Sequence, residues 1–284
     1  EAKAITERTL HFFKSVLDDY KEEIECFGST PTMYAGLVDA KGNLQLYEGA
    51  LRFRAADGKM IEDQIAAEDY ASFIGETSLR ESYLKAPYFI PRGVADGIYR
   101  VGPLARLNVA DRCGTPKADA ELEEFRQRFG SPAHSSFLFH YARLIEIMYA
   151  LERMERLLSD PGILDTHVRA NAGVNAMEGV GIIEAPRGTL IHHYKVSPDG
   201  AIAWANLIVA TGHNNLAIGK SVRQVAEHYV HGDKLDEGVL NRVSAVVRAY
   251  DPCLSCSTHA SGMVAMKIRL VGPAGRLLDE VASD

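Results

Sequence analysis

Two cysteines and a histidine near the end of the 284-residue chain have the spacing of a metal-binding loop. Cys253 and Cys256 stand three residues apart, and His259 follows three residues after the second cysteine. A loop that turns at Pro252 can aim both sulfur atoms at one point. Pairs of thiolates hold soft or borderline metal ions, and imidazole binds several of the same ions. The pattern therefore predicts that Cys253 and Cys256 form a metal clamp.

Two other chemistries use the same cysteine spacing. A structural zinc site takes four protein ligands, normally from two such pairs, and the remaining cysteines, Cys26 and Cys113, have no cysteine three residues away. A thioredoxin-type redox pair opens a helix after a strand, whereas this motif follows a helical run and a proline. A single C-x-x-C is weak evidence, so the spacing alone leaves these alternatives open.

The flanks of the cysteine pair and two earlier stretches narrow the choice. An aspartate and a proline before the first cysteine complete the pattern D-P-C-x-x-C-x-x-H. Glu-Ala-Pro-Arg-Gly stands at 184–188 with His-His-Tyr at 192–194, and Gly-Ile-Tyr-Arg-Val-Gly-Pro-Leu-Ala-Arg stands at 97–106. In this order the stretches resemble motifs of the large subunit of nickel–iron (NiFe) hydrogenases. Arg-Ala-Tyr at 248–250 and a tail after the histidine are most similar to the soluble, NAD-reducing type.

The resemblance implies reversible, heterolytic oxidation of H2 coupled to a soluble electron acceptor such as NAD. It implies nickel held by four thiolates, two of which bridge to an iron that carries carbon monoxide and two cyanides. Cys253 corresponds to the terminal nickel ligand and Cys256 to the nickel–iron bridge. His259 and the backbone carbonyl of Leu207 correspond to ligands of a nearby divalent ion, usually magnesium. Either a thiolate or a guanidinium would accept the proton.

Arg187 stands in a stretch that favours a tight loop. Pro186 fixes its own φ and restricts the residue before it, so the arginine can present a rigid fork of five donors. By itself this pattern favours a surface arginine that pairs with a carboxylate. The resemblance instead places Arg187 beside the metal pair, as a donor to a cyanide, with Asp251 over the open coordination position. Pro186, Ala210 and Thr211 correspond to residues around the cofactor, and the Thr211 hydroxyl corresponds to a donor for the second cyanide.

The chain departs from the family at its first motif. R-x-C-G-x-C-x-x-x-H, which supplies the other two nickel thiolates, does not occur: Cys26 is followed by Phe-Gly-Ser and Cys113 by Gly-Thr-Pro. The family's N-terminal carboxylate for proton exit is missing as well. We therefore expect an inactive fragment or precursor of a longer subunit. The alternative is a non-catalytic scaffold or electron-transfer subunit, like the quinone-site subunit of respiratory complex I, although that relative lacks the cysteine pair retained here.

Composition excludes several classes of protein. With 46% hydrophobic and 24% charged residues, the chain has an ordinary globular composition. A net charge of −7 argues against a nucleic-acid partner, and no apolar run approaches the ~20 residues that span a bilayer. Thiol ligands need a reducing compartment, so we expect a cytoplasmic protein. The resemblance adds an iron–sulfur small subunit, diaphorase subunits and a maturation endopeptidase as partners.

Apolar periodicity and turn residues predict an α+β fold, predominantly helical, with a helix-bundle body and small antiparallel sheets, like the NiFe-hydrogenase large subunit. Helices are expected at 5–25, 66–82, 118–129, 135–158, 216–230 and 235–249. An antiparallel meander is expected over 31–65, an irregular segment over 83–99, and hairpins over 190–211 and 263–281. The strand after the turn at 197–200 is expected to run to Thr211.

The chain is expected to divide into residues 1–259, the C-terminal portion of a nickel-dependent hydrogenase large subunit, and residues 260–284, a hairpin-like processing extension. In the family, an endopeptidase removes such an extension after nickel insertion. Four other predictions concern single residues. Cys26 is expected to be a buried small hydrophobe. Arg100 and Arg106 are expected to be structural, and His134, His140, His192 and His193 to pack rather than to bind metal.

Overall fold

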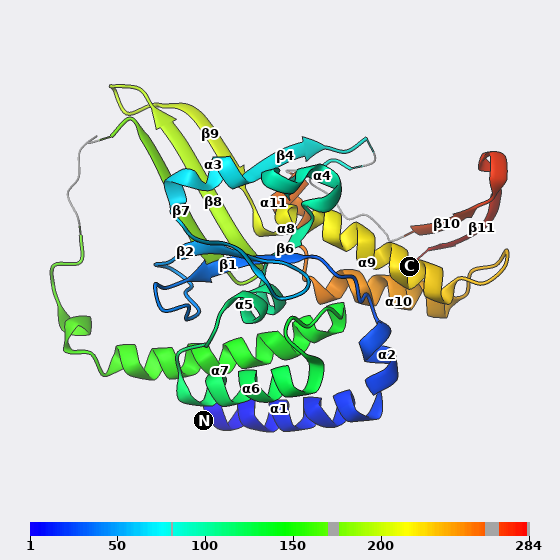
Figure 1. Ribbon diagram of the computed structural model, residues 1–284, viewed down its shortest axis with the longest axis horizontal. Helices are drawn as coiled ribbons and strands as arrows, with labels where there is room; N and C mark the ends of the chain where they lie inside the picture. The colour runs from blue at the N-terminus through cyan, green and yellow to red at the C-terminus, as the bar shows by residue number, and fades with distance from the viewer. Residues whose placement is uncertain (81, 170–175, 259–266, 283–284) are drawn as a thin grey trace.

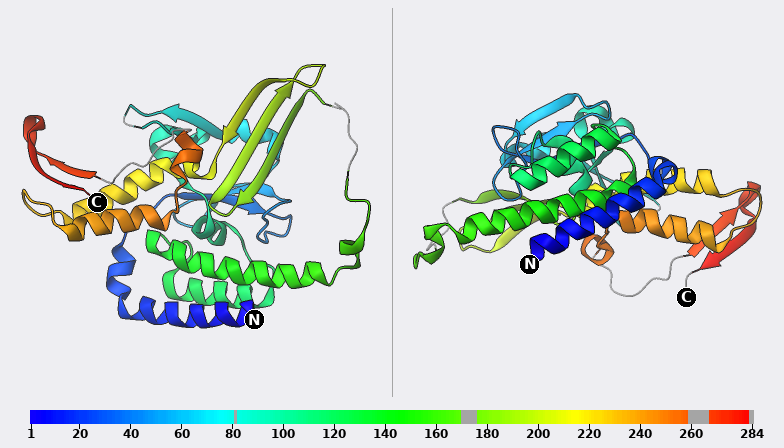
Figure 2. Two further views of the ribbon diagram at one scale, coloured as in Figure 1. Left: turned by 180° about the vertical axis from the view of Figure 1, so that it is seen from behind. Right: turned by 90° about the horizontal axis from the view of Figure 1, so that it is seen from below.

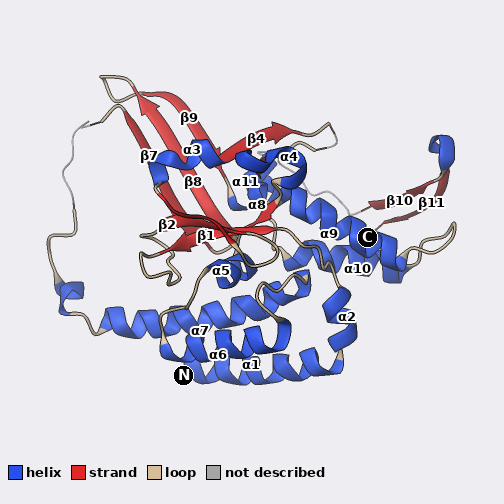
Figure 3. Ribbon diagram, in the orientation of Figure 1, coloured by secondary structure: helices blue, strands red, loops and turns tan. Residues whose placement is uncertain are grey.

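The computed structural model describes residues 1–80, 82–169, 176–258 and 267–282. A layer of long helices, a four-stranded sheet and a three-stranded sheet form the body, and a further helix pair lies against them (Figure 1, Figure 3). Most of the regular structure is helical, and most of the strand pairing is antiparallel. The predicted α+β class with small antiparallel sheets is confirmed.

Three long helices form one side of the molecule (Figure 1, Figure 2): α1 (Ala2–Asp19), α6 (Pro116–Phe129) and α7 (Phe139–Leu158). Apolar residues recur at intervals of three and four, so each helix has an apolar face. Leu10 of α1 and Phe125 of α6 are buried there. The predicted helices at 118–129 and 135–158 are confirmed, although the second opens with a 3-10 turn, η3 (Ser136–Leu138), and η4 (Pro161–Leu164) follows its end.

The predicted helix over 5–25 is interrupted at Tyr20, whose φ of −118° and ψ of 28° are not helical. A short helix, α2 (Lys21–Cys26), continues at an angle to the first (Figure 1). Cys26 is half-buried rather than buried. It ends this short helix, and its Sγ lies 3.2 Å from the carbonyl oxygen of Glu23. The expectation that Cys26 is a buried hydrophobe is therefore wrong.

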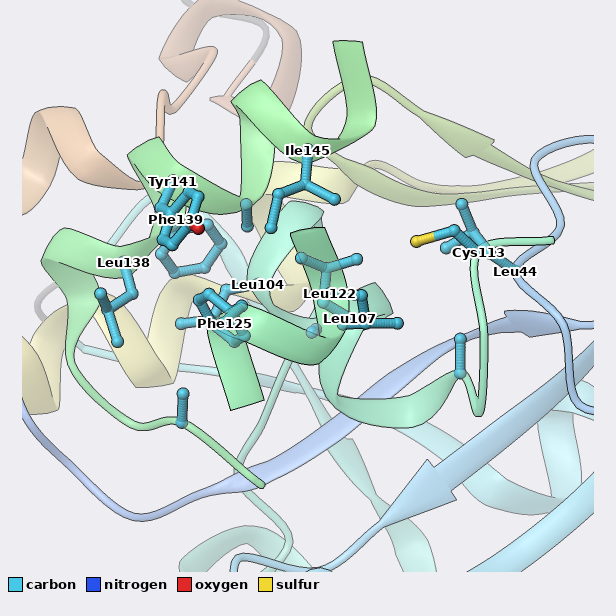
Figure 4. Close-up of a cluster of buried hydrophobic side chains, with 14 of the residues drawn as sticks. Leu44, Leu104, Leu107, Cys113, Leu122, Phe125, Leu138, Phe139, Tyr141 and Ile145 are labelled. Carbon is cyan, nitrogen blue, oxygen red and sulfur yellow. The ribbon is translucent and has the colours of Figure 1, made fainter. Parts of the chain in front are cut away.

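The core beneath the helical layer is built around α5 (Pro103–Val109), all of whose residues are buried. Leu104 and Leu107 of this helix lie in one apolar cluster with Phe125 and Ile145, and Cys113 belongs to the same cluster (Figure 4). Burying a large apolar side chain contributes roughly 1.5–3 kcal/mol. The cluster therefore joins the helices to the sheet that lies on the other side of α5.

That sheet has the order β3-β2-β1-β6. Its strands are β1 (Met33–Val38), β2 (Ala50–Arg54), β3 (Met60–Ile65) and β6 (Tyr99–Arg100). β1 is buried along its whole length, which explains its continuous apolar sequence. The predicted antiparallel meander over 31–65 is confirmed. β6 adds a parallel partner that pairs Met33 with Tyr99.

The predicted helix over 66–82 is wrong beyond its first turns. Only η1 (Ala67–Asp69) and α3 (Tyr70–Phe73) are helical, and β4 (Ile74–Ser78) then pairs with β5 (Lys85–Phe89). Ile74 stands opposite Phe89, and both are buried in the cluster beside the first sheet. Tertiary pairing thus overrides the helical pattern. The segment expected to be irregular contains β5, β6 and two short helices, η2 (Ile90–Arg92) and α4 (Gly93–Asp96).

A three-stranded antiparallel sheet projects beside the first one (Figure 1): β7 (Glu178–Ala185), β8 (Gly188–Val196) and β9 (Ile202–Ile208). The predicted hairpin is confirmed, but β9 ends at Ile208. Val209 is still extended, whereas Ala210 and Thr211 begin a four-residue helix, α8 (Ala210–His213). The expectation that the strand runs to Thr211 is wrong. Helix α8 is anchored by His213, which bonds Tyr99 of β6, and by Asn214, which bonds the backbone of Val101.

The further helix pair is α9 (Asn215–Tyr229) and α10 (Glu237–Ala249). Asp236 caps α10 by accepting a hydrogen bond from the backbone N–H of Val239 at 2.7 Å. Val239, Val243 and Val246 form its inner face, as predicted. Helix α10 leads into the cysteine loop, and a short helix, α11 (Leu254–Thr258), follows.

The described part of the tail forms a hairpin, as predicted, from β10 (Lys267–Val271) and β11 (Leu277–Ala282), with η5 (Pro273–Gly275) at its turn. Positions 263–266 of the predicted hairpin lie outside the described residues. It lies beyond the ends of α9 and α10 (Figure 1, Figure 2). Asp279 accepts a hydrogen bond from the backbone N–H of Leu235 at 2.7 Å, and Ile268 packs against the apolar cluster of α10.

Candidate metal centre

The cysteine loop brings its two sulfur atoms together. Cys253 and Cys256 form a disulfide, with their Cα atoms 5.4 Å apart, which is the oxidised form of two thiols that could otherwise bind a metal. The chain turns first at Asp251, whose φ of 51° lies in the left-handed region. Its backbone N–H still bonds the carbonyl oxygen of Arg248 at 2.9 Å, which closes α10. The motif opens α11 but follows a helix, not the strand of a thioredoxin-type site.

Arg187 reaches this loop from the sheet. Pro186 and Arg187 form the two-residue connection between β7 and β8, because Ala185 pairs with Gly188. The Nε of Arg187 donates to the backbone oxygen of Asp251 at 2.7 Å and lies 3.1 Å from its Oδ2. The Nη2 donates to Oδ1 at 3.3 Å. The carboxylate partner expected for a surface arginine is therefore the aspartate that precedes the cysteine loop.

This ion pair contributes little to stability. The side chains of Arg187 and Asp251 are 43% and 50% exposed, and exposed ion pairs are typically worth about 0–1 kcal/mol. Their arrangement matters for position instead. The arginine and the aspartate, 64 residues apart in the chain, lie at the start of the loop that carries both sulfurs.

Thr211 holds the loop from another side. Its buried hydroxyl accepts a hydrogen bond from the backbone N–H of Cys253 at 3.0 Å. A hydroxyl has one donor hydrogen and two lone pairs, so this contact leaves its hydrogen available to a further partner. Ala210, also buried, precedes it in α8. Helix α8 thus places a hydroxyl beside the first cysteine.

Helix α8 is fixed by two residues that the sequence did not single out. The hydroxyl of Tyr99 bonds Nδ1 of His213 at 2.5 Å. Asn214 accepts from the backbone N–H of Val101 at 2.9 Å and donates to the carbonyl of the same residue at 3.3 Å. Burial lowers the pKa of His213 to about 3, so its ring is neutral. The sequence gives one signal for these two anchors: their partners, Tyr99 and Val101, lie in the stretch at 97–106 that resembles the hydrogenase family.

Leu207 lies beside a cavity of about 400 Å³ that reaches α11. Ser257, near the end of that helix, and Asn206 of β9 also line this cavity. His259, the other predicted ligand of a divalent ion, lies outside the described residues. The structure therefore places Leu207 and the residue two before His259 at one cavity.

The other two cysteines lie elsewhere. Cys113 is 1% exposed in the apolar core, where burial raises its thiol pKa, and Cys26 ends α2. Within the described ranges, no group of three or more His, Cys, Asp or Glu side chains could hold a metal ion. The sequence has four cysteines in all. The donor set at the loop is therefore two thiols, which is half of the four-thiolate nickel site that the resemblance implies.

The remaining predicted residues take part in packing and hydrogen bonding. His193 bonds the hydroxyl of Tyr70 at 3.0 Å and the carboxylate of Glu178 at 2.8 Å. Arg100 is fully buried and donates to the backbone oxygen of His134 at 2.7 Å. Arg106 pairs with two carboxylates, as one of the two sequence-based interpretations allowed.

Among the described residues, none of the helices has the length and apolar character needed to cross a bilayer.

Comparison with known proteins identifies the family to which the chain belongs. A family model described as nickel-dependent hydrogenase matches residues 43–259. In Methanococcus voltae, the F420-non-reducing hydrogenase vhc contains a chain that is 43% identical over 261 residues, which cover 90% of this chain and 55% of that protein. NAD-reducing hydrogenase HoxS subunit beta of Cupriavidus necator is 38% identical over 277 residues, covering 96% of this chain and 57% of that protein.

Solved structures of hydrogenases are also similar to this chain. An NAD+-reducing NiFe hydrogenase in the H2-reduced state superimposes with a TM-score of 0.86 at 40% identity, over 90% of this chain and 57% of that one. The Ni-Fe-Se hydrogenase from D. vulgaris Hildenborough, 22% identical with a TM-score of 0.65, shares the fold. The chain spans about half the length of the curated relatives it matches. The family match and these identities show that the chain belongs to the nickel-dependent hydrogenase family.

Proposed function

We propose that this chain supplies the C-terminal half of the nickel site in the large subunit of a NiFe hydrogenase, which oxidises H2 reversibly and passes electrons to a soluble acceptor such as NAD. One observation carries the proposal. Arg187 of the β7–β8 turn and Thr211 of α8 converge on the loop that contains Cys253 and Cys256. The NAD-reducing relative supports the choice of acceptor.

In the reduced protein, Cys253 would be the terminal nickel ligand and Cys256 the bridge to iron. The bound metal pair supplies the Lewis-acid chemistry that activates H2. Around it, the chain fixes donors: Arg187 uses Nε and Nη2 on Asp251, which leaves other N–H groups of its fork for an anionic ligand. The Thr211 hydroxyl has a hydrogen left for a second such ligand. Arg187 and Thr211 therefore suit two cyanides, and Pro186 and Ala210 are proposed to lie around the bound metal pair.

Asp251 is proposed to stand with Arg187 over the open coordination position of the metal. Because the guanidinium bonds both the backbone and the carboxylate of Asp251, the two charged groups keep a fixed mutual orientation. The Asp251 carboxylate can therefore hold the Arg187 guanidinium at one place, and proton transfer by a side chain requires such positioning. The carbonyl of Leu207 and His259 are proposed to bind magnesium, which is supported by the cavity that Leu207 shares with Ser257.

The other two thiolates are proposed to come from outside these 284 residues, because the chain has four cysteines and two lie away from the loop. The same count supports a second candidate function, a non-catalytic scaffold or electron-transfer subunit on this fold. Partners are proposed from the relatives, whose names describe subunits and in one case an iron–sulfur subunit. The proposed partners are diaphorase subunits and an iron–sulfur small subunit. The proposed compartment is the cytoplasm, because thiolate ligands need reducing conditions.

Residues 260–284 are proposed to be an extension that a maturation endopeptidase removes after His259. Two features support this. Among the described residues 267–282, the hairpin joins the body through the Asp279–Leu235 hydrogen bond and the packing of Ile268. Its strands are otherwise half or fully exposed. A hairpin held in this way can leave without disturbing the core.

Metal analysis tests the proposed function. The chain purified alone should contain no stoichiometric nickel or iron, because two thiolates are too few for the site. The complex isolated through this chain from its own cells should contain about one nickel per chain and show cyanide bands in the infrared. A complex free of nickel would refute the catalytic assignment and favour the scaffold. A stoichiometric centre in the isolated chain would refute the half-site.

A further inference from the structure

Arg106 of α5 is enclosed, and each of its five N–H donors has a partner. Its Nε and Nη2 donate to the two carboxylate oxygens of Glu146 at 2.6 and 2.7 Å. Its Nη1 donates to Oε2 of Glu184 at 2.8 Å. The last two donors reach backbone oxygens: Nη1 that of Ala185 at 2.9 Å and Nη2 that of Pro186 at 3.2 Å. A guanidinium has five such donors in a planar fork, so its hydrogen-bonding capacity is filled.

The two carbonyls belong to the residues directly before Arg187. Glu184, at the near end of the same turn, also accepts from the hydroxyl of Thr189 on β8 at 2.7 Å. It accepts from the backbone N–H of Leu37 in β1 at 3.2 Å. The turn that presents Arg187 is therefore tied on both sides, and to the first sheet, by one buried charge network.

The charges in this network depend on one another. Burial by itself would lower the pKa of Arg106, but Glu146 and Glu184 outweigh burial and raise it. Burial raises the pKa of Glu184, and the positive charge of Arg106 opposes that rise. Removing one partner of a buried pair leaves an uncompensated buried charge, which is strongly destabilising. The network is therefore maintained as a unit.

The residues directly before α5 also touch the turn. A Cβ on Gly102, which has a φ of 96° and precedes α5, would lie 2.7 Å from the carbonyl oxygen of Arg187. A Cβ on Gly188, with a φ of 138°, would lie 2.4 Å from Cγ2 of Val101. Only glycine fits such approaches. The helix that carries Arg106 is thus packed against the turn that carries Arg187.

Helix α7 connects the network to the cysteine loop. Arg143 stands three residues before Glu146, so the two side chains share a face of α7. The Nη2 of Arg143 donates to the carbonyl oxygen of Ala249, the last residue of α10, at 2.7 Å. One helix therefore holds the Arg187 turn through Glu146 and Arg106, and holds the end of α10, which leads into Asp251, through Arg143.

We propose that Arg106 is a positioning residue, which sets the place of Arg187 against Asp251. Glu146 and Glu184 hold its guanidinium, and the guanidinium in turn holds the carbonyls of the two residues before Arg187. Its consequence for turnover rests on the proposed function, whereas its effect on the turn does not. Lysine at this position would keep the charge but could reach fewer of the five acceptors, because an ammonium has three donors and no planar fork.

The test compares Arg106→Lys with Arg52→Lys in the native complex. Arg52 is a matched control because its side chain is also buried, 5% exposed, and pairs with Asp63 and Asp111 away from the turn. We expect Arg106→Lys to speed amide hydrogen exchange at residues 187–189, 250, 251 and 253 about tenfold more than Arg52→Lys does; the prolines at 186 and 252 carry no amide hydrogen. Equal exchange at these residues in the two variants would overturn the proposal. If Arg106→Lys does not fold, Glu146→Gln is measured in its place, with the same two outcomes.

Turnover separates this inference from the proposed function. Arg106→Lys should retain nickel and lower kcat, with a shift of the cyanide infrared bands that Arg52→Lys does not show. If Arg187→Lys lowers kcat but Arg106→Lys changes neither kcat nor those bands, the positioning role is wrong. Exchange at the turn could instead rise as expected while Arg106→Lys and Arg187→Lys both turn over like wild type. Arg106 then still positions the turn, and the role of Arg187 in the proposed function is wrong.

Discussion

The helical layer and the cysteine loop are held by different kinds of contact. In the helical layer, Phe125 and Tyr141 are fully buried and their rings lie 5.5 Å apart within a large apolar cluster. At the cysteine loop, the fixing contacts are single polar ones: Arg187 with Asp251, and Thr211 with Cys253. Stability therefore resides mainly in the first region and local geometry in the second. Substitutions should separate the two.

The largest effect is expected for Cys253→Ser or Cys256→Ser in the native complex. Either change should abolish hydrogen turnover and lose nickel, because serine does not replace a thiolate ligand. Under reducing conditions, the free energy of unfolding should change by less than about 1 kcal/mol, since the loop is at the surface. Turnover, metal content and chemical denaturation measure this. Cys26→Ser is the matched control, and hydrogen uptake that survives in either loop variant would contradict the assignment.

The opposite result is expected in the helical layer. Phe125→Ala should lower the free energy of unfolding by about 3–5 kcal/mol, through lost burial and the cavity left behind. Phe12→Ala on α1 is the control, because that ring is 68% exposed. Denaturant unfolding of both variants measures the difference. Similar losses of stability in the two variants would show that the buried cluster is not the main support of the layer.

Arg187→Lys should keep the metals and cut turnover on the order of 100-fold, or about 3 kcal/mol, as when a preorganised donor is lost. Lysine keeps the charge but not the planar fork. Stability should hardly change, because Arg187 is 43% exposed. Arg128→Lys, which alters an arginine–carboxylate pair of the helical layer, is the control. Wild-type turnover in Arg187→Lys would reduce this arginine to a surface ion pair.

Acidity should act on the anchor of α8. The folded pKa of His213 is about 3, against an ordinary value of 6.5. The unfolded chain thus binds this proton more readily, so the stability contribution is complete above about pH 6.5 and is lost as pH falls toward 3. Between roughly pH 7.5 and 5.5, His213 should account for about 1.4 kcal/mol of lost stability.

Comparing wild type with His213→Gln by denaturant unfolding at both pH values measures this loss. His167→Gln is the control, because the His167 side chain is 94% exposed. An unchanged dependence of stability on pH in His213→Gln would show that this ring is not held neutral.

The same contrast explains what the sequence could predict. The helices at 116–129, 215–229 and 237–249 were expected within two residues of each end, because their apolar faces are written in local spacing. The prediction of a helix over 66–82 is wrong beyond its first turns, because β4 forms by pairing with β5, which local spacing does not show. The predicted strand includes Ala210 and Thr211 for a similar reason: only the contacts of His213 and Asn214 show why a helix starts there.

For the site, local spacing predicted that Cys253 and Cys256 converge, which the structure shows. It could not predict contacts between distant segments. Arg187 and Asp251 are 64 residues apart, and Arg106 and Glu184 are 78 apart. From the residues alone, Arg106 has two interpretations, a partner of buried carboxylates or a surface charge, and the sequence favours a structural role without identifying its partners. The metal roles of the site residues and the cleavage of the tail remain predictions.

The smallest effect is expected from removing the tail. Deleting residues 260–284 should change the free energy of unfolding of the body by less than about 1 kcal/mol. Among the described residues 267–282, the hairpin contributes one hydrogen bond to Leu235, which is typically worth about 0.5–1.5 kcal/mol, and the partial burial of Ile268. Part of that gain is offset by the conformational entropy lost when the hairpin docks. A loss above about 2 kcal/mol would mean that the strand pair is a permanent part of the body. In that case mass spectrometry of the active, metal-loaded complex should find the tail intact, whereas a removable extension should be absent from it.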